Sequence, residues 1–188
     1  MLRRLVLLCC VALSVPSSLA QAHDASTLSE AEVEQLRDSA YVPSDRVLVF
    51  IKLLESRVRI MHDLMAKPRA PGREEDVHEL LEQFTAISDE LNDNLDDYET
   101  RHRDIRKPLP KLLDASERWA SSLRALPEDD AYNLSRKLAL QSVRDTREEV
   151  TKLIDTQRAY FAAHPEAAKA ERQREDPGYQ GPIPSNPH

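Results

Sequence analysis

The sequence has very little glycine, and this scarcity excludes whole classes of site. Its 188 residues include only Gly72, Gly178 and Gly181. Phosphate-binding loops, dinucleotide fingerprints and nucleophile elbows all need Gly where the backbone turns tightly against a ligand or a catalytic group. Because none of these motifs can be built, we expect a protein that is not an enzyme.

Cysteine is equally scarce. Cys9 and Cys10 are the only two, and both lie in the apolar N-terminal segment. The rest of the chain therefore has no disulfide, no thiolate nucleophile, no Cys-ligated metal and no Cys-x-x-Cys-His haem attachment. We expect a domain that is stabilised by burial alone and carries no cofactor.

The N-terminus has the pattern of an export signal. Arg3 and Arg4 precede an apolar run, and Ala20-Gln21-Ala22 forms a small-x-small cleavage site. Residues 1–22 are therefore predicted to be a signal peptide, cleaved after Ala22 or alternatively after Ala20, which would place the protein in the periplasm or outside the cell. The run is shorter than the roughly 20 residues of a membrane-spanning helix, so no integral span is expected after cleavage.

The charge balance is acidic. The formal net charge is −7, and cleavage would remove Arg3 and Arg4 and lower it by two, to −9. An acidic chain without a basic tract is not expected to bind nucleic acid or an anionic membrane surface. The expected partner is another protein, and self-association is compatible with the sequence.

Apolar residues recur every three or four positions, and nothing alternates as a strand would. The spacing predicts helices over about 29–40, 46–67, 73–102, 108–126 and 131–163. Short loops with Pro separate them. Pro43 is expected to interrupt the helical structure, and the next helix is expected to begin at Ser44 or Asp45. Ser29 and Glu32 have the spacing of a capping box at the start of the first helix. The longest helix carries one narrow stripe, formed by Val77, Leu80, Phe84, Ile87, Leu91 and Tyr98.

These helices predict an all-α fold, an up-down-up-down antiparallel four-helix bundle with a short extra N-terminal helix. Residues 23–165 are expected to form this single domain. Residues 166–188 are expected to continue as a helical extension into a disordered, Pro-rich tail from about Asp176.

Two groups of residues are candidate ligands for a metal or cofactor. Glu75 and His78 have the Glu-x-x-His spacing of di-iron bundles, with Glu82 on the same face, but only one copy occurs. At 100° per residue this face lies opposite the buried stripe, which favours a solvated charged surface. His102 continues the stripe, and Met61 and Met65 on the preceding helix are conceivable co-ligands. The competing interpretation makes His102 a cation at a helix C-terminus and the methionines core residues.

An acidic stripe is the candidate partner surface. Asp89, Asp93, Asp96 and Asp97 follow the outer face of the longest helix, where like charges four residues apart are mildly unfavourable without a counterpart. The sequence thus favours an exported, non-enzymatic protein-binding or envelope accessory factor, adaptor-like or chaperone-like. The alternative is a periplasmic four-helix bundle that binds a small molecule, metal or haem.

Overall fold

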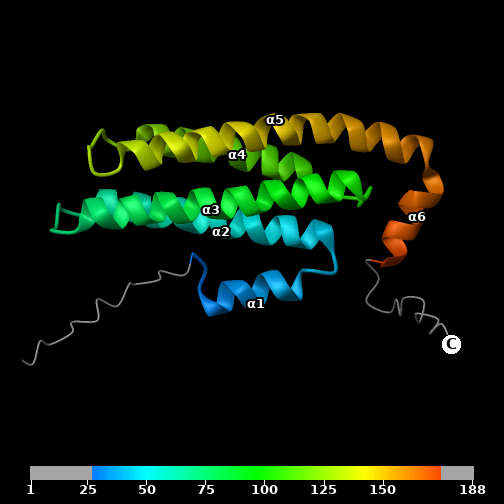
Figure 1. The fold of residues 1–188 in the computed structure, drawn as a ribbon, viewed down its shortest axis with the longest axis horizontal. Helices are drawn as coiled ribbons and strands as arrows, with labels where there is room; N and C mark the ends of the chain where they lie inside the picture. Colours follow the sequence, from blue (N-terminus) through cyan, green and yellow to red (C-terminus); the bar gives the residue numbers. More distant parts are fainter. Residues whose placement is uncertain (1–26, 175–188) are drawn as a thin grey trace, which may run out of the picture.

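The computed structural model describes residues 27–174, and every regular element among them is a helix (Figure 1). This confirms the predicted all-α class. The predicted signal peptide and the predicted disordered tail lie outside the described residues. The six helices are α1 (Glu30–Asp38), α2 (Pro43–Ala66), α3 (Arg73–Thr100), α4 (Leu109–Ala125), α5 (Asn133–Ala163) and α6 (Pro165–Arg174).

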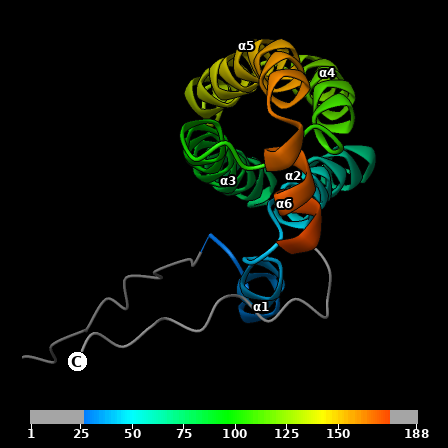
Figure 2. The ribbon, with the colours of Figure 1, turned by 90° about the vertical axis from the view of Figure 1, so that its right-hand side faces the viewer.

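Helices α2 to α5 surround one core, α1 lies outside α2, and α6 crosses one end (Figure 2). Around this ring α2 contacts α3 and α4, and α5 contacts the same two helices. The hairpins α2–α3 and α4–α5 are antiparallel. In contrast, α3 and α5 are parallel. Hydrogen bonds join His78 to Ser135 and Glu99 to Lys152, so residue numbers increase in the same direction along both helices.

The connection formed by residues 101–108 makes this arrangement possible. Helices α3 and α4 lie diagonally across the core, so this segment must cross one end of the bundle. Eight residues can span up to about 26 Å when extended, whereas a tight hairpin loop joins only adjacent helices. As a result α2 and α4 run parallel and begin at the same end, beside α6 (Figure 1).

The core contains more of α3 than one stripe. All six predicted stripe residues are buried, but Leu81, Ser88 and Leu95 are fully buried as well. They face the second neighbour, α5, where Ser142 Oγ donates to Ser88 Oγ at 2.8 Å and Thr146 Oγ1 lies 3.3 Å from the same hydroxyl. A helix with two neighbours buries two faces, which a single periodic stripe underestimates.

Helix starts follow local rules, with one correction. Ser29 and Glu32 form the predicted capping box at the start of α1. Pro43 was expected to interrupt the chain but is the first residue of α2, where its fixed φ suits a helix and its missing N–H is not needed. Gly72 precedes α3 with a φ of 85°, a left-handed conformation that glycine adopts without strain.

Helix α1 is held by a buried arginine of α2. The Arg57 side chain is 7% exposed, and its Nη1 and Nη2 donate to the two carboxylate oxygens of Glu32 at 2.5 and 2.9 Å. Its Nε donates to Gln83 Oε1, and Nη2 also donates to the Thr27 carbonyl. The hydrogen bond from Arg57, together with those from Ser29, outweighs burial and lowers the pKa of Glu32 to about 2.

No helix within residues 27–174 combines the length and the apolar composition needed to cross a bilayer.

Candidate functional site: a basic cavity beneath α6

A cavity of about 560 Å³ lies at the end of the bundle that α6 crosses. Five parts of the chain form its wall: the start of α2, the crossing connection, the start of α4, the last third of α5, and α6. The lining residues are Ser44, Asp104, Arg106, Lys107, Leu109, Pro110, Ile154, Arg158 and Arg172. The volume is within the range of small-molecule sites, roughly 300–1,000 Å³.

The wall is strongly basic in an otherwise acidic protein. Four lining side chains are cations, and Asp104 is the one acidic residue among the nine. Within residues 27–174, Lys107 and Arg172 have no carboxylate in ion-pair range, and Arg158 has only Asp155, at 3.6 Å on an exposed surface. Asp104 is committed to Arg106. The cavity therefore holds an excess of positive charge that the described residues do not neutralise.

Arg106 is held rigidly at the wall. Asp104 accepts from its Nε at 2.9 Å and its Nη2 at 2.6 Å, and the guanidinium lies over the Phe161 ring, 4.5 Å from the centroid. Burial alone would raise the pKa of Asp104, but the hydrogen bonds and charge of Arg106, with the charge of the more distant Arg172, lower it overall, so this carboxylate stays ionised. The hydrogen bond to Asp104 also raises the pKa of Arg106.

The crossing connection is fixed by side chains of two helices. Gln157 of α5 is buried, and its amide accepts from the Ile105 N–H at 3.0 Å while donating to the Arg103 carbonyl at 2.9 Å. Ser44 of α2 donates to the Asp104 carbonyl at 3.1 Å. These bonds satisfy backbone groups that would otherwise be buried without partners, and they fix the position of Arg106 and Lys107.

A buried carboxylate anchors α6. Glu171 is 4% exposed and accepts from Arg103 Nε at 2.9 Å and from the Asp104 N–H at 3.3 Å, and it also pairs with Arg174. The next residue along α6 is Arg172, which lines the cavity. The position of Arg172 therefore depends on the docking of Glu171.

Helix polarity adds to the positive potential. Both α2 and α4 begin at the cavity, and neither has a side-chain cap for its first N–H groups. The N-terminal end of a helix carries about half a positive charge, which favours an anion nearby. Taken with the four cations, this makes the cavity suited to an anionic ligand.

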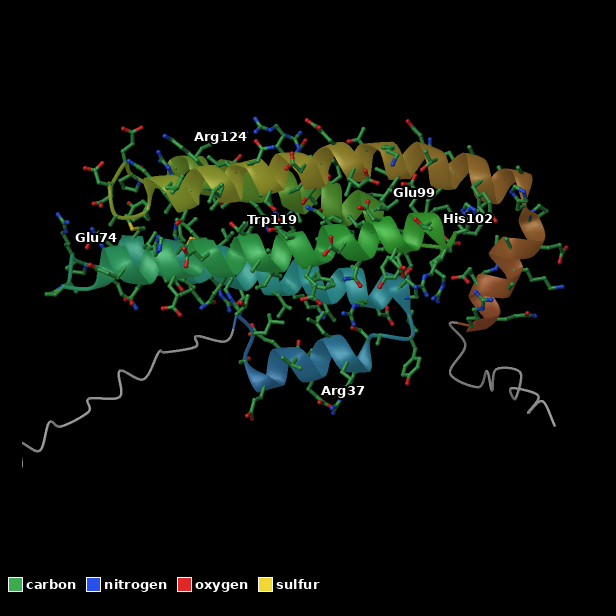
Figure 3. The ribbon with its side chains drawn as sticks, viewed as in Figure 1. Arg37, Glu74, Glu99, His102, Trp119 and Arg124 are labelled. Carbon is green, nitrogen blue, oxygen red and sulfur yellow. The ribbon has the colours of Figure 1, made fainter. Side chains whose placement is uncertain are left out.

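The structure separates His102 from the two methionines. Because α2 and α3 are antiparallel, Met61 and Met65, near the end of α2, lie far along the bundle from the end of α3. His102 follows α3 with a φ of 52°, is exposed, and stacks on Tyr160 at 3.9 Å, close to α6 (Figure 3). Met61 is buried in the core, and both methionines line a different cavity, between α2 and α4. The three residues do not form one site.

His78 lies at the edge of the predicted solvated face, and its side chain is 42% exposed. It faces α5, where its Nδ1 lies 2.8 Å from Ser135 Oγ, while Nε2 lies 3.2 Å from Glu82 Oε1. Glu75 is exposed and does not join them. Helix α5 therefore covers one edge of this face, and the rest of the face is open to solvent.

The order Ser135–His78–Glu82 is that of a hydrolase triad, but Ser135 is only 5% exposed. A nucleophile needs open space for an incoming carbonyl group. We therefore interpret these contacts as structural bonds between α3 and α5. No group of three or more His, Cys, Asp or Glu side chains that could hold a metal ion occurs within residues 27–174.

The acidic stripe is exposed but only partly unpaired. Asp89, Asp93 and Asp96 are exposed and Asp97 is half-exposed. Asp97 pairs with Arg101 at 2.7 Å and Asp89 accepts from Ser142 at 3.1 Å, whereas Asp93 and Asp96 have no ion pair inside the described range. The free acidic surface is therefore smaller than the sequence indicated.

Sequence reasoning missed the basic cavity because its cations are distant in sequence. Arg106 and Lys107 are adjacent, but Arg158 and Arg172 follow some 50 and 65 residues later. The only local signal was the concentration of basic residues between Arg101 and Lys107, just before Pro108. A search of protein-family models, of curated proteins and of solved structures gives no match to this chain.

Proposed function

We propose that this protein binds a small organic anion with at least two negative charges in the basic cavity. The observation that carries the proposal is the set of four cations around one cavity with one carboxylate, Asp104, which pairs with Arg106. Lys107 and Arg172 have no carboxylate within ion-pair distance among residues 27–174. Arginine forks bind carboxylates and phosphates through paired hydrogen bonds, and lysine adds a mobile point charge. An anion would replace the missing counter-charge.

The cavity wall favours binding over catalysis. Its lining has neither histidine nor cysteine, and Asp104, its one carboxylate, is neutralised by Arg106. These residues supply charge and orientation but no nucleophile paired with a base. With residues 1–22 as a signal peptide, the proposed ligand would be met in the periplasm or outside the cell. We propose an up-down-up-down bundle of α2–α5 as the rigid frame.

Thermal denaturation and calorimetry with citrate, and separately with inorganic phosphate, test the proposal at physiological ionic strength. Citrate is expected to raise the melting temperature and to bind saturably. The double variant Lys107→Glu/Arg172→Glu should weaken citrate binding more than about tenfold, because each charge-assisted contact contributes about 1.5–3 kcal/mol.

The control for this experiment is Arg124→Glu. Arg124 is exposed near the end of α4, away from α6 (Figure 3), so its reversal changes the net charge without altering the cavity. Citrate binding should survive in this variant. Equal loss in the control and the double variant, or no binding of either anion by the unaltered protein, would disprove the proposal.

A protein partner is the second candidate, and the exposed, unpaired Asp93 and Asp96 favour it. These carboxylates are suited to a basic surface on an adaptor's partner.

A further inference from the structure

A second site lies between α2 and α4, towards the hairpin-loop end of the bundle. Two adjoining hollows of about 330 and 390 Å³ share Val58, His62 and Ser122, so together they form one trough along the helices. The trough is bounded on the α4 side by the short side chains of Ser121, Ser122 and Ala125.

The two ends of the trough differ in chemistry. The end nearer the hairpin loops is apolar, with Met61, Met65, Leu123 and Leu126 in its wall. The end nearer the middle of the bundle is polar and contains Glu55, Arg59 and Arg118. Arg118 pairs with Glu55 at 2.6 Å, whereas the exposed Arg59 has no ion pair among residues 27–174. One cation is therefore free at the polar end.

Trp119 provides an independent observation at that polar end (Figure 3). It is 1% exposed, and its ring packs edge-on against Phe84 with centroids 5.8 Å apart. Its indole Nε1 is buried and has no hydrogen-bond partner. Buried donors in proteins nearly always have an acceptor, so this indole is an incompletely satisfied group in the wall of the trough.

We propose that the trough binds a single-chain anionic amphiphile of the fatty-acid type. The carboxylate would lie near Arg59 and beside the Trp119 indole, and the alkyl chain would follow Val58 towards Met61 and Met65. Methionine side chains adapt readily to a flexible chain. Packed helices have axes 8–10 Å apart, so a slot between them fits an alkyl chain better than another helix, which is about 10 Å wide. This site is separate from the basic cavity and would take a ligand with one charge and a tail.

The fluorescence of Trp119 reports on this trough directly, because the chain contains one tryptophan. Titration with decanoate below its micelle concentration is expected to give a saturable change in emission. Butyrate, which has the headgroup without the tail, should give none at the same concentrations. Citrate should not compete, and Lys107→Glu/Arg172→Glu should bind decanoate normally, which separates this site from the basic cavity.

Two variants of exposed residues test the position of the ligand without disturbing the core. Ser122→Phe should block the trough and abolish the decanoate response, and Arg59→Glu should weaken binding at least tenfold. Lys52→Glu, a reversal on an exposed position of α2 outside the trough, is the matched control and should leave binding intact. An absent response in the unaltered protein, or unchanged decanoate binding by Ser122→Phe, would overturn the proposal.

Discussion

Two charged side chains are buried within the described part of the chain, and each attaches a terminal helix to the bundle. Arg57 binds Glu32 of α1, and Glu171 of α6 binds Arg103 in the crossing connection. A buried charge is costly to leave unpaired, so removing one partner of such a pair typically costs about 3–5 kcal/mol. The position of each terminal helix therefore depends on one buried charged side chain and its partners.

The pair at α1 predicts acid sensitivity. Arg57 lowers the pKa of Glu32 from 4.5 to about 2, so the unfolded chain binds more protons than the folded chain between these values. The stability that this carboxylate contributes is complete above pH 4.5 and is lost as the pH falls towards 2. The lowered pKa of Asp104 acts in the same direction.

Urea denaturation at a series of pH values measures this effect. Glu32→Gln should lower the free energy of unfolding at pH 7 by up to about 3 kcal/mol, since one pKa unit corresponds to about 1.4 kcal/mol, and should flatten its dependence on pH below 4.5. Glu30→Gln, at an exposed neighbouring position, serves as the control. An unchanged pH profile in Glu32→Gln would show that Arg57 does not determine it.

At the scale of elements, Glu171 anchors α6, and α6 forms one side of the basic cavity. Glu171→Gln keeps the size of the side chain but removes the charge that holds Arg103. Hydrogen exchange in α6 and at the Asp104 amide should become at least about tenfold faster, because hydrogen bonds to a charged group contribute about 1.5–3 kcal/mol. Citrate binding should weaken in parallel.

Glu166→Gln provides the matched comparison on the same helix, because Glu166 is exposed in the first turn of α6. If both variants exchange at the rate of the unaltered protein, Glu171 does not anchor α6. If Glu171→Gln exchanges faster yet binds citrate with full affinity, the docked position of Arg172 is not needed for the ligand.

The helices were largely predictable from sequence, whereas their neighbours were not. Apolar spacing predicted the stripe from Val77 to Tyr98, and Ser29 with Glu32 predicted the start of α1. The same spacing could not show that α3 meets α5 through Ser88, because polar residues at a helix contact resemble an exposed face. The contact of His78 with Ser135 could not be predicted for the same reason.

The candidate site was less predictable, because it depends on how the chain crosses the bundle. The basic residues near Arg106 were visible in the sequence, but only the diagonal position of α3 and α4 brings them beside Arg158 and Arg172. Similarly, the spacing of Met61 and Met65 predicted that they lie on the buried face of their helix, but not that they line a trough between this helix and α4. Pairing between distant helices determines both sites.

At the scale of the whole molecule, the crossing connection divides the chain into two helical hairpins. The hairpin α2–α3 packs against the hairpin α4–α5, and residues 101–108 connect the two hairpins covalently. The same contacts could form between hairpins of two different chains if this link were extended. Such an exchange of identical elements is domain swapping, and the hinge segment determines whether it occurs.

The bonds that fix the crossing connection are therefore expected to act against such an exchange. Gln157→Ala removes the two bonds to the Ile105 N–H and the Arg103 carbonyl, and it is expected to increase the dimer fraction after refolding at high concentration. Light scattering during size-exclusion chromatography measures this fraction, with Gln141→Ala on the exposed face of α5 as the control. A Gln157→Ala protein with the dimer fraction of the unaltered protein would show that Gln157 does not restrain the hinge. One buried amide would otherwise decide whether each hairpin packs with its own chain or with a neighbour's.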